Sequence, residues 1–226
     1  MKAKKINTYI FDLDDTLYEE IQFVKAGMMS VCLYVSKKYG LECKELFDYC
    51  MELLEKEGRG KIFDNLCAKY ELDEKVSELV KIYRGTEPNL SLYEDAEECL
   101  LELKKQGFKL GDITDGNAKV QGAKVRGLGL NKLVDAVLLT DEMRRDDGSS
   151  FSKPAAEVYE ECLKMLGAKP DESVYVGDNP NKDFIGARKL GMGTVHIVRD
   201  RGMFVGAKVS EEYEADKKIH SLKELI

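Results

Sequence analysis

The chain has no long apolar run, no long basic run and no Cys-x-x-Cys pair in its 226 residues. No stretch approaches the roughly 20 apolar residues that a membrane-spanning helix needs. The apolar run at 9–11 is interrupted by Asp12, which makes it too short for the core of a signal peptide. From these absences we expect a cytoplasmic protein with no membrane partner.

Positive charge is scarce relative to negative charge. The net charge is -7, with 34% charged and 43% apolar residues, which is enough for a sizeable core and a solvated surface. Proteins that bind nucleic acid usually carry a basic face, so we expect no nucleic-acid partner. A local basic pocket for a small anion stays compatible with this balance, because net charge does not describe a single cleft.

Metal-binding or catalytic patterns of cysteine and histidine are also missing. The six cysteines match no zinc spacing, and we interpret them as reduced, partly buried apolar residues. His196 lies in a predicted strand and His220 near the C-terminus, neither with an evident partner in the sequence. We therefore expect structural roles for both.

Between about residues 20 and 84, apolar residues recur at helical spacing in four separate stripes. Gly40 and Gly58 follow the first two stripes, where glycine commonly ends a helix. Four short amphipathic helices can bury their apolar faces against one another. The pattern predicts a small four-helix domain in this part of the chain.

After the break at 85–89, strand and helix patterns alternate. The predicted strands are 6–13, 108–114, 134–139, 173–176 and 194–198. The predicted helices are 93–106, 117 to 127 or 129, 154–167 and 181–190. This alternation predicts an α/β fold with a doubly wound parallel sheet, interrupted after its first strand by the helices. For 199–226 only a short helix at 221–225 is predicted.

Polar residues follow several of these strands. In an open parallel sheet, ligands bind beyond the carboxyl ends of the strands. The residues expected at that edge are Asp12, Asp14, Thr114, Asp115, Asp178 and Asp183, with Lys153 before the next helix. Each fragment alone is also ordinary turn or cap chemistry, but their convergence at one edge points to one site.

In this order the motifs resemble those of the haloacid dehalogenase (HAD) superfamily. They are Phe-Asp-Leu-Asp-Asp-Thr-Leu (11–17), Ile-Thr-Asp-Gly-Asn (113–117), Lys153-Pro154 and Val-Gly-Asp-Asn-Pro-Asn-Lys-Asp (176–183). The resemblance covers nearly the whole chain. It implies a Rossmann-like core at 1–17 and 90–226, a mobile helical cap at 18–89, and Mg²⁺ as cofactor.

The resemblance also implies a mechanism. Asp12 is expected to attack phosphorus and become an aspartyl phosphate, while Asp14 protonates the leaving group and then deprotonates water. Asp12, the main-chain carbonyl of Asp14 and the side chain of Asp178 are expected to hold Mg²⁺.

The remaining motif residues are expected to assist. Thr114 and Lys153 bind the phosphoryl oxygens, helped by backbone N–H groups near Leu13 and Asp115. Asp183 is expected to orient water or Lys153 rather than to bind the metal directly.

The expected activity is Mg²⁺-dependent hydrolysis of a small soluble phosphomonoester. Asp14 favours phosphoryl chemistry over dehalogenation, because a departing halide needs no proton. A phosphomutase with the same intermediate is an alternative, and a non-catalytic protein that binds a phosphate ligand is another. The sequence does not identify the phosphorylated metabolite or the oligomeric state.

Two features depart from a simple version of this pattern. Asp112 occupies a strand position where an apolar residue is expected, and we interpret it as a buried carboxylate with satisfied hydrogen bonds, with a place close to the site as the alternative. The charged segment 141–152 is interpreted as a solvated, flexible loop, with a substrate-facing arginine as the alternative.

Overall fold

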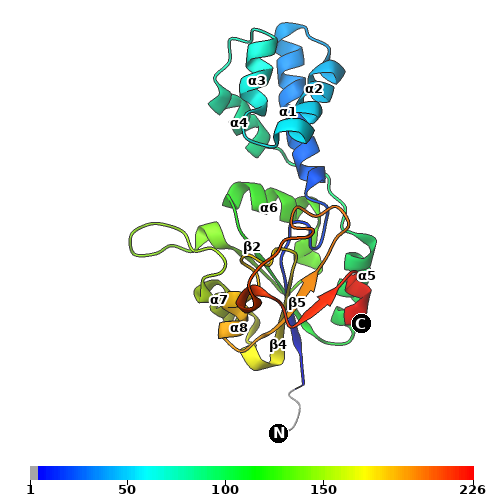
Figure 1. Ribbon diagram of the computed structural model, residues 1–226, viewed down its shortest axis with the longest axis vertical. Helices are drawn as coiled ribbons and strands as arrows, with labels where there is room; N and C mark the ends of the chain where they lie inside the picture. Colours follow the sequence, from blue (N-terminus) through cyan, green and yellow to red (C-terminus); the bar gives the residue numbers. More distant parts are fainter. Residues whose placement is uncertain (1–4) are drawn as a thin grey trace. The chain divides into compact units, whose positions relative to one another are not determined.

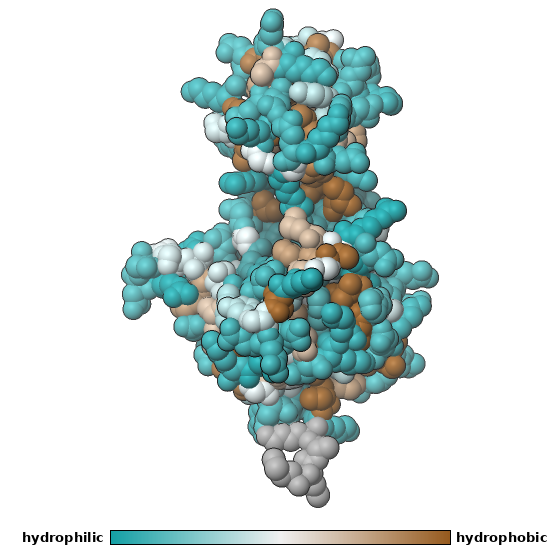
Figure 2. All heavy atoms as spheres, in the orientation of Figure 1, coloured by the Kyte–Doolittle hydropathy of each residue, from teal (hydrophilic) through white to brown (hydrophobic). Residues whose placement is uncertain are grey.

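The computed structural model describes residues 5–226 and divides the chain into two compact units (Figure 1). One unit is formed by the chain up to Glu20 together with Leu90–Ile226, and the other by Ile21–Asn89. On the face drawn in Figure 2, hydrophilic side chains dominate the surface of each unit. Among residues 5–226, no helix has both the length and the apolar character needed to cross a bilayer.

The unit Ile21–Asn89 is helical. Its helices are α1 (Ile21–Tyr39), α2 (Cys43–Glu57), α3 (Ile62–Lys69) and α4 (Val76–Arg84). Their apolar faces form one buried core, to which Val31, Leu46, Leu66 and Leu79 contribute, one from each helix. The prediction of four helices is confirmed, because the sequence spacing places these side chains on one face of each helix.

The other unit contains a parallel sheet of six strands within residues 5–226. Its strands are β1 (Thr8–Phe11), β2 (Lys109–Thr114), β3 (Ala136–Leu139), β4 (Ser173–Gly177), β5 (Gly193–Ile197) and β6 (Lys217–Ile219). They are ordered β3-β2-β1-β4-β5-β6, each parallel to its neighbour. The predicted doubly wound α/β sheet is therefore confirmed.

Four α-helices connect and cover this sheet. They are α5 (Glu94–Lys105), α6 (Ala118–Gly127), α7 (Ala156–Leu166) and α8 (Ile185–Lys189). Short 3-10 helices occur at Leu130–Lys132, Thr140–Glu142, Pro170–Glu172, Glu211–Tyr213 and Leu222–Leu225. Ile10 and Tyr175 of the sheet pack with Tyr159, Cys162 and Phe184 in one buried core.

Some predicted boundaries were wrong. The helix expected from Pro154 begins at Ala156, after a cis peptide between Lys153 and Pro154. The helix expected at 181–190 is only Ile185–Lys189, because Asn179 and Asp183 fold the preceding residues into a turn. Strand β6 was not predicted, since its three residues carry no clear alternation.

The predicted short helix at 221–225 is present as a 3-10 helix, with a capping box formed by Ser221 and Glu224. The charged segment 141–152 folds back on itself, with a bridge between Arg144 and Ser150 and with Arg145 over the ring of Phe151. Its residues 144–150 are exposed.

Asp112 is fully buried, but the expectation that its hydrogen bonds are satisfied was wrong. It lies in register with Phe11 and Val137, and neither carboxyl oxygen has a hydrogen-bond partner. Burial, and then the nearby charge of Asp12, raise the pKa of Asp112 well above its ordinary value. The native fold therefore holds Asp112 as a neutral acid at a cost in stability.

Replacing Asp112 with valine should stabilise the protein, because valine suits a buried strand and removes the unpaired oxygens. In the unfolded chain Asp112 ionises as pH rises above its usual pKa of 3.8, whereas in the folded protein it stays protonated to higher pH. The free energy of unfolding of the unaltered protein therefore falls as pH rises above 3.8. We expect Asp112→Val to raise the free energy of unfolding, and this gain should grow by about 1.4 kcal/mol for each pH unit between pH 5 and 8 over which folded Asp112 stays protonated.

Urea unfolding at the two pH values measures this difference. Asp146→Val, at an exposed loop position, is the control and should change neither value. A destabilised Asp112→Val protein, or a gain independent of pH, would contradict the account of Asp112.

Candidate active site

The predicted site residues follow three neighbouring strands. Strand β1 lies between β2 and β4 in the sheet, so Asp12, Asp115 and Asp178 lie at the carboxyl ends of adjacent strands. From β1 the chain passes to one side of the sheet and later returns to β4 on the other side. Ligands bind at such a switch point in open parallel sheets.

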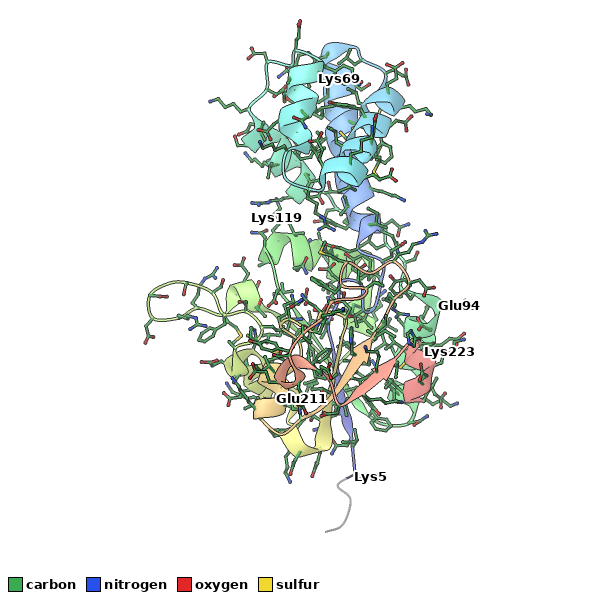
Figure 3. The ribbon with its side chains drawn as sticks, viewed as in Figure 1. Lys5, Lys69, Glu94, Lys119, Glu211 and Lys223 are labelled. Atoms are coloured by element: carbon green, nitrogen blue, oxygen red, sulfur yellow. The ribbon has the colours of Figure 1, made fainter. Side chains whose placement is uncertain are left out.

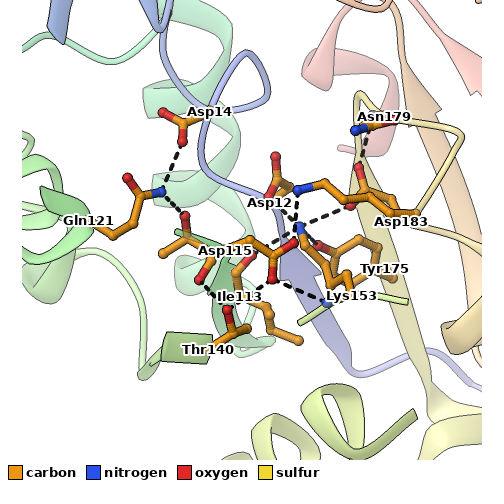
Figure 4. A network of polar contacts seen from close by, with 12 residues as sticks. Asp12, Asp14, Ile113, Asp115, Gln121, Thr140, Lys153, Tyr175, Asn179 and Asp183 are labelled. Carbon is orange, nitrogen blue, oxygen red and sulfur yellow. Dashed lines mark hydrogen bonds and ion pairs between the residues drawn. The ribbon is translucent and has the colours of Figure 1, made fainter. Parts of the chain in front are cut away.

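Lys153 is the buried cation at this edge (Figure 4). Its side chain is fully buried, and its Nζ donates to Tyr175 Oη at 2.8 Å and pairs with Asp12 and, at 2.9 Å, with Asp183. Burial alone would lower the pKa of Lys153, but the two carboxylates raise it well above its usual range. Lys153 is therefore a fixed positive charge beside Asp12.

Three buried acids lie close together at this edge, and Lys153 pairs with two of them, Asp12 and Asp183. Asp12, Asp178 and Asp183 each offer a carboxylate oxygen, and these oxygens lie within 4.8 Å of one another. Burial, partly offset by Lys153, raises the pKa of Asp12 to about 6. Burial and then Asp12 and Asp183 raise the pKa of Asp178 to about 9. A cluster of carboxylate oxygens with excess negative charge fits a hard divalent cation such as Mg²⁺.

The turn after β4 holds Asp183 in place. Its Oδ2 accepts a hydrogen bond from the backbone N–H of Asn179 at 2.9 Å, and its Oδ1 faces Lys153. A Cβ at Gly177 would lie 2.4 Å from Asp183 Oδ2, so only glycine leaves room for this side chain. Both Asp183 oxygens thus contact the protein, which agrees with a supporting role. That role stays a prediction.

The side chain of Asp14 is directed toward helix α6 (Figure 4). Lys124 Nζ lies 2.7 and 2.8 Å from its two oxygens, Tyr18 Oη donates at 2.6 Å, and Gln121 Nε2 donates at 2.9 Å. Burial would raise the pKa of Asp14, but Lys124, followed by Tyr18 and Gln121, holds it below its ordinary value. Asp14 is a carboxylate in this arrangement.

Thr114 and Asp115 lie at the end of β2. The hydroxyl of Thr114 is buried and accepts a hydrogen bond from Gln121. Asp115 accepts from Thr140 Oγ1 at 2.9 Å, from the backbone N–H of Lys153 at 3.2 Å and from Lys182 Nζ at 2.8 Å. Burial raises the pKa of Asp115, but the two lysines outweigh it and lower the pKa.

The structure thus brings Asp12, Asp178, Asp183 and Lys153 together and turns the Asp14 carboxyl toward α6. Sequence reasoning missed Gln121, Lys124, Lys182, Tyr175 and Thr140. Lys182 lies inside the motif 176–183, but the motif did not indicate a role for it. The other four residues lie outside the motifs, so only their positions near strand ends could have indicated them.

His196 has a partner that the sequence did not reveal. Its Nε2 lies 3.0 Å from the main-chain oxygen of Asp178, and its ring packs near that of Phe184. Burial lowers the pKa of His196, despite this contact. The ring contacts the backbone of the turn after β4, which fits the expected structural role.

An open parallel sheet with an acid-rich, lysine-containing edge is the architecture of an α/β protein with a candidate active site at that edge. The chain belongs to the haloacid dehalogenase-like hydrolase family, which matches residues 9–197. The family resemblance predicted from the motifs is therefore confirmed.

Relatives and solved structures cover almost the full chain. A glyceraldehyde 3-phosphate phosphatase from Methanocaldococcus jannaschii is 32% identical, covering 98% of this chain and 96% of its own. A pyrophosphatase PpaX from Bacillus cereus is 28% identical, covering 98% and 95%. The crystal structure of a HAD phosphatase from Thermococcus onnurineus matches with a TM-score of 0.61 and 27% identity, covering 97% and 96%. The prediction of a phosphatase-type hydrolase is confirmed.

Mg²⁺ binding to the substrate-free protein should tighten as pH rises. The ion binds ionised carboxylates, whereas the pKa of Asp12 is about 6 and that of Asp178 about 9. Between these two pKa values, binding of the ion displaces a proton from the site, so the Mg²⁺ affinity should increase by about tenfold for each pH unit. Isothermal titration calorimetry at pH 6, 7 and 8 measures this trend.

Asp178→Asn should remove detectable Mg²⁺ binding, while Asp146→Asn, at an exposed loop position, should leave it unchanged. Equal affinity at pH 6 and 8, or a variant at Asp178 that binds like the unaltered protein, would count against a metal site at these acids.

Proposed function

We propose that this protein is a Mg²⁺-dependent phosphatase that hydrolyses a small phosphomonoester through an aspartyl phosphate on Asp12. The observation that carries the proposal is Asp12 itself, which is buried, pairs with Lys153 and lies close to the carboxylates of Asp178 and Asp183. Phosphoryl transfer needs a nucleophile together with positive charge that offsets the phosphate dianion. The membership in a hydrolase family supports the same reaction class.

The metal ligands in this proposal are the Asp12 and Asp178 carboxylates and the main-chain carbonyl of Asp14, with Asp183 supporting the site. Bound Mg²⁺ would supply positive charge between the phosphate and the attacking carboxylate. Lys153 adds fixed positive charge beside Asp12, and the hydroxyl of Thr114 is proposed to bind a phosphoryl oxygen, with backbone N–H groups near Leu13 and Asp115.

The proposed reaction has two steps, formation of the aspartyl phosphate and its hydrolysis. In the first, an oxygen of Asp12 bonds to phosphorus while the ester P–O bond breaks, and Asp14 gives its proton to the departing oxygen. In the second, water attacks phosphorus, passes a proton to Asp14, and releases phosphate and free Asp12. The resting carboxylate form of Asp14 suits the second step, and the negative charge of a bound phosphate ester favours the protonated form that the first step needs.

The proposed substrate is a small, soluble phosphate ester in the cytoplasm. A relative 32% identical over 228 residues is named for glyceraldehyde 3-phosphate, so we propose a three-carbon sugar phosphate first. Pyrophosphate, which is an anhydride rather than an ester, is the second candidate, because relatives 28% identical over 231 residues are named pyrophosphatases. We further propose that the helical segment 18–89 acts as a cap that excludes bulk water and large substrates.

Phosphate release from a panel of phosphorylated metabolites, including glyceraldehyde 3-phosphate and pyrophosphate, tests the proposal. Release should require Mg²⁺ and should fall by about 10³-fold or more in Asp12→Asn, because the amide cannot attack phosphorus. Asp146→Asn is the matched exposed control and should keep full activity. Full activity in Asp12→Asn would show that Asp12 is not the nucleophile.

The same panel separates the alternatives. A phosphomutase would return an isomerised ester with little free phosphate, which chromatography of the products would reveal. A non-catalytic phosphate-binding protein would bind panel members and release phosphate from none of them.

A further inference from the structure

Helix α6 directs two polar side chains toward Asp14. Gln121 and Lys124 are three residues apart, which places them on the same side of the helix. They are almost fully buried, with exposed fractions of 2% and 3%. Neither belongs to the motifs that resemble the HAD family, and neither has a role in the chemistry proposed above.

Lys124 is bound to Asp14 through both carboxylate oxygens. The distances from Nζ are 2.7 Å to Oδ1 and 2.8 Å to Oδ2, and Glu20 Oε1 is a more distant second acid at 3.8 Å. A buried ammonium is costly unless it is paired. One oxygen would be enough for charge balance, whereas contact with both also fixes the direction in which the carboxyl group points.

Two further donors fix the same carboxyl group. Tyr18 Oη donates to Oδ1 of Asp14 at 2.6 Å, and Gln121 Nε2 donates to Oδ2 at 2.9 Å. Gln121 also donates to the hydroxyl of Thr114, the proposed phosphoryl ligand. The orientation of Asp14 is thereby tied to the place where the phosphoryl group is expected.

We propose that Lys124 is a positioning residue for the reaction, which holds the Asp14 carboxyl where it can exchange a proton with the leaving oxygen. The inference rests on the proposed function, in which Asp14 is the general acid. Lys124 contacts the Asp14 carboxyl oxygens and acts on the reaction only through them. Its removal should therefore impair proton transfer to the leaving group and spare the other parts of the site.

Leaving groups of different basicity isolate this effect. An alkyl phosphate expels a strongly basic alkoxide, which needs a proton as the P–O bond breaks. The phenolate leaving group of 4-nitrophenyl phosphate is weakly basic and departs without one. A poorly positioned acid thus slows the first reaction much more than the second, whereas general damage to the fold slows both alike.

The experiment compares kcat/KM for glyceraldehyde 3-phosphate and 4-nitrophenyl phosphate in Lys124→Met. We expect a loss of at least about tenfold for the alkyl ester and less than about threefold for the aryl ester. In an Asp14→Asn background, adding Lys124→Met should cause no further selective loss. Lys124→Arg, which keeps the charge and can contact both oxygens, should recover part of the alkyl activity.

Lys119→Met is the matched control, since Lys119 is an exposed lysine on the same helix (Figure 3), and it should leave both values unchanged. Equal losses for the two esters, or no loss, would overturn the role of Lys124 while leaving the proposed function intact. If the unaltered protein hydrolysed neither ester nor any other phosphate ester, the proposed function would fail and this inference with it. If Lys124→Met does not fold, Lys124→Gln takes its place, and absence of a selective loss in Lys124→Gln would overturn the inference.

Discussion

The ion pairing of buried Lys153 with Asp12 and Asp183 is the interaction on which the rest of the site depends. It places a permanent cation beside the proposed nucleophile and compensates part of the negative charge at the end of β1 and in the turn after β4. The compensation is incomplete, because burial and the neighbouring carboxylates still raise the pKa of Asp178. The excess negative charge is what makes the site fit a divalent cation, and it links the architecture of the sheet to phosphoryl chemistry.

The fold and the acidic edge could be predicted because they follow from strong local patterns. Strand β4 is buried at every position and apolar at its centre, and the parallel order brings the carboxyl ends of the strands to one edge. Asp12, Asp115 and Asp178 therefore lie at the same edge of the sheet because of the strand order alone, independently of side-chain packing. The four helical stripes of Ile21–Asn89 were readable for the same reason, since each buries one face.

The rest depended on side-chain packing between distant elements. Lys124 and Gln121 look like ordinary surface residues of a helix, and only the placement of α6 against the loop after β1 turns them toward Asp14. Asp112 was expected to find a partner, but its strand neighbours offer none. The short β6 and the shortened α8 reflect local hydrogen bonding that periodicity does not report.

The central claim is that phosphate passes through a covalent bond to Asp12. Rapid quenching during turnover, followed by borohydride reduction, converts an aspartyl phosphate to homoserine, which peptide mass spectrometry locates. The account predicts homoserine at position 12, absent when substrate or Mg²⁺ is omitted. Phosphate release with an unmodified Asp12, or with the label on another residue, would contradict it.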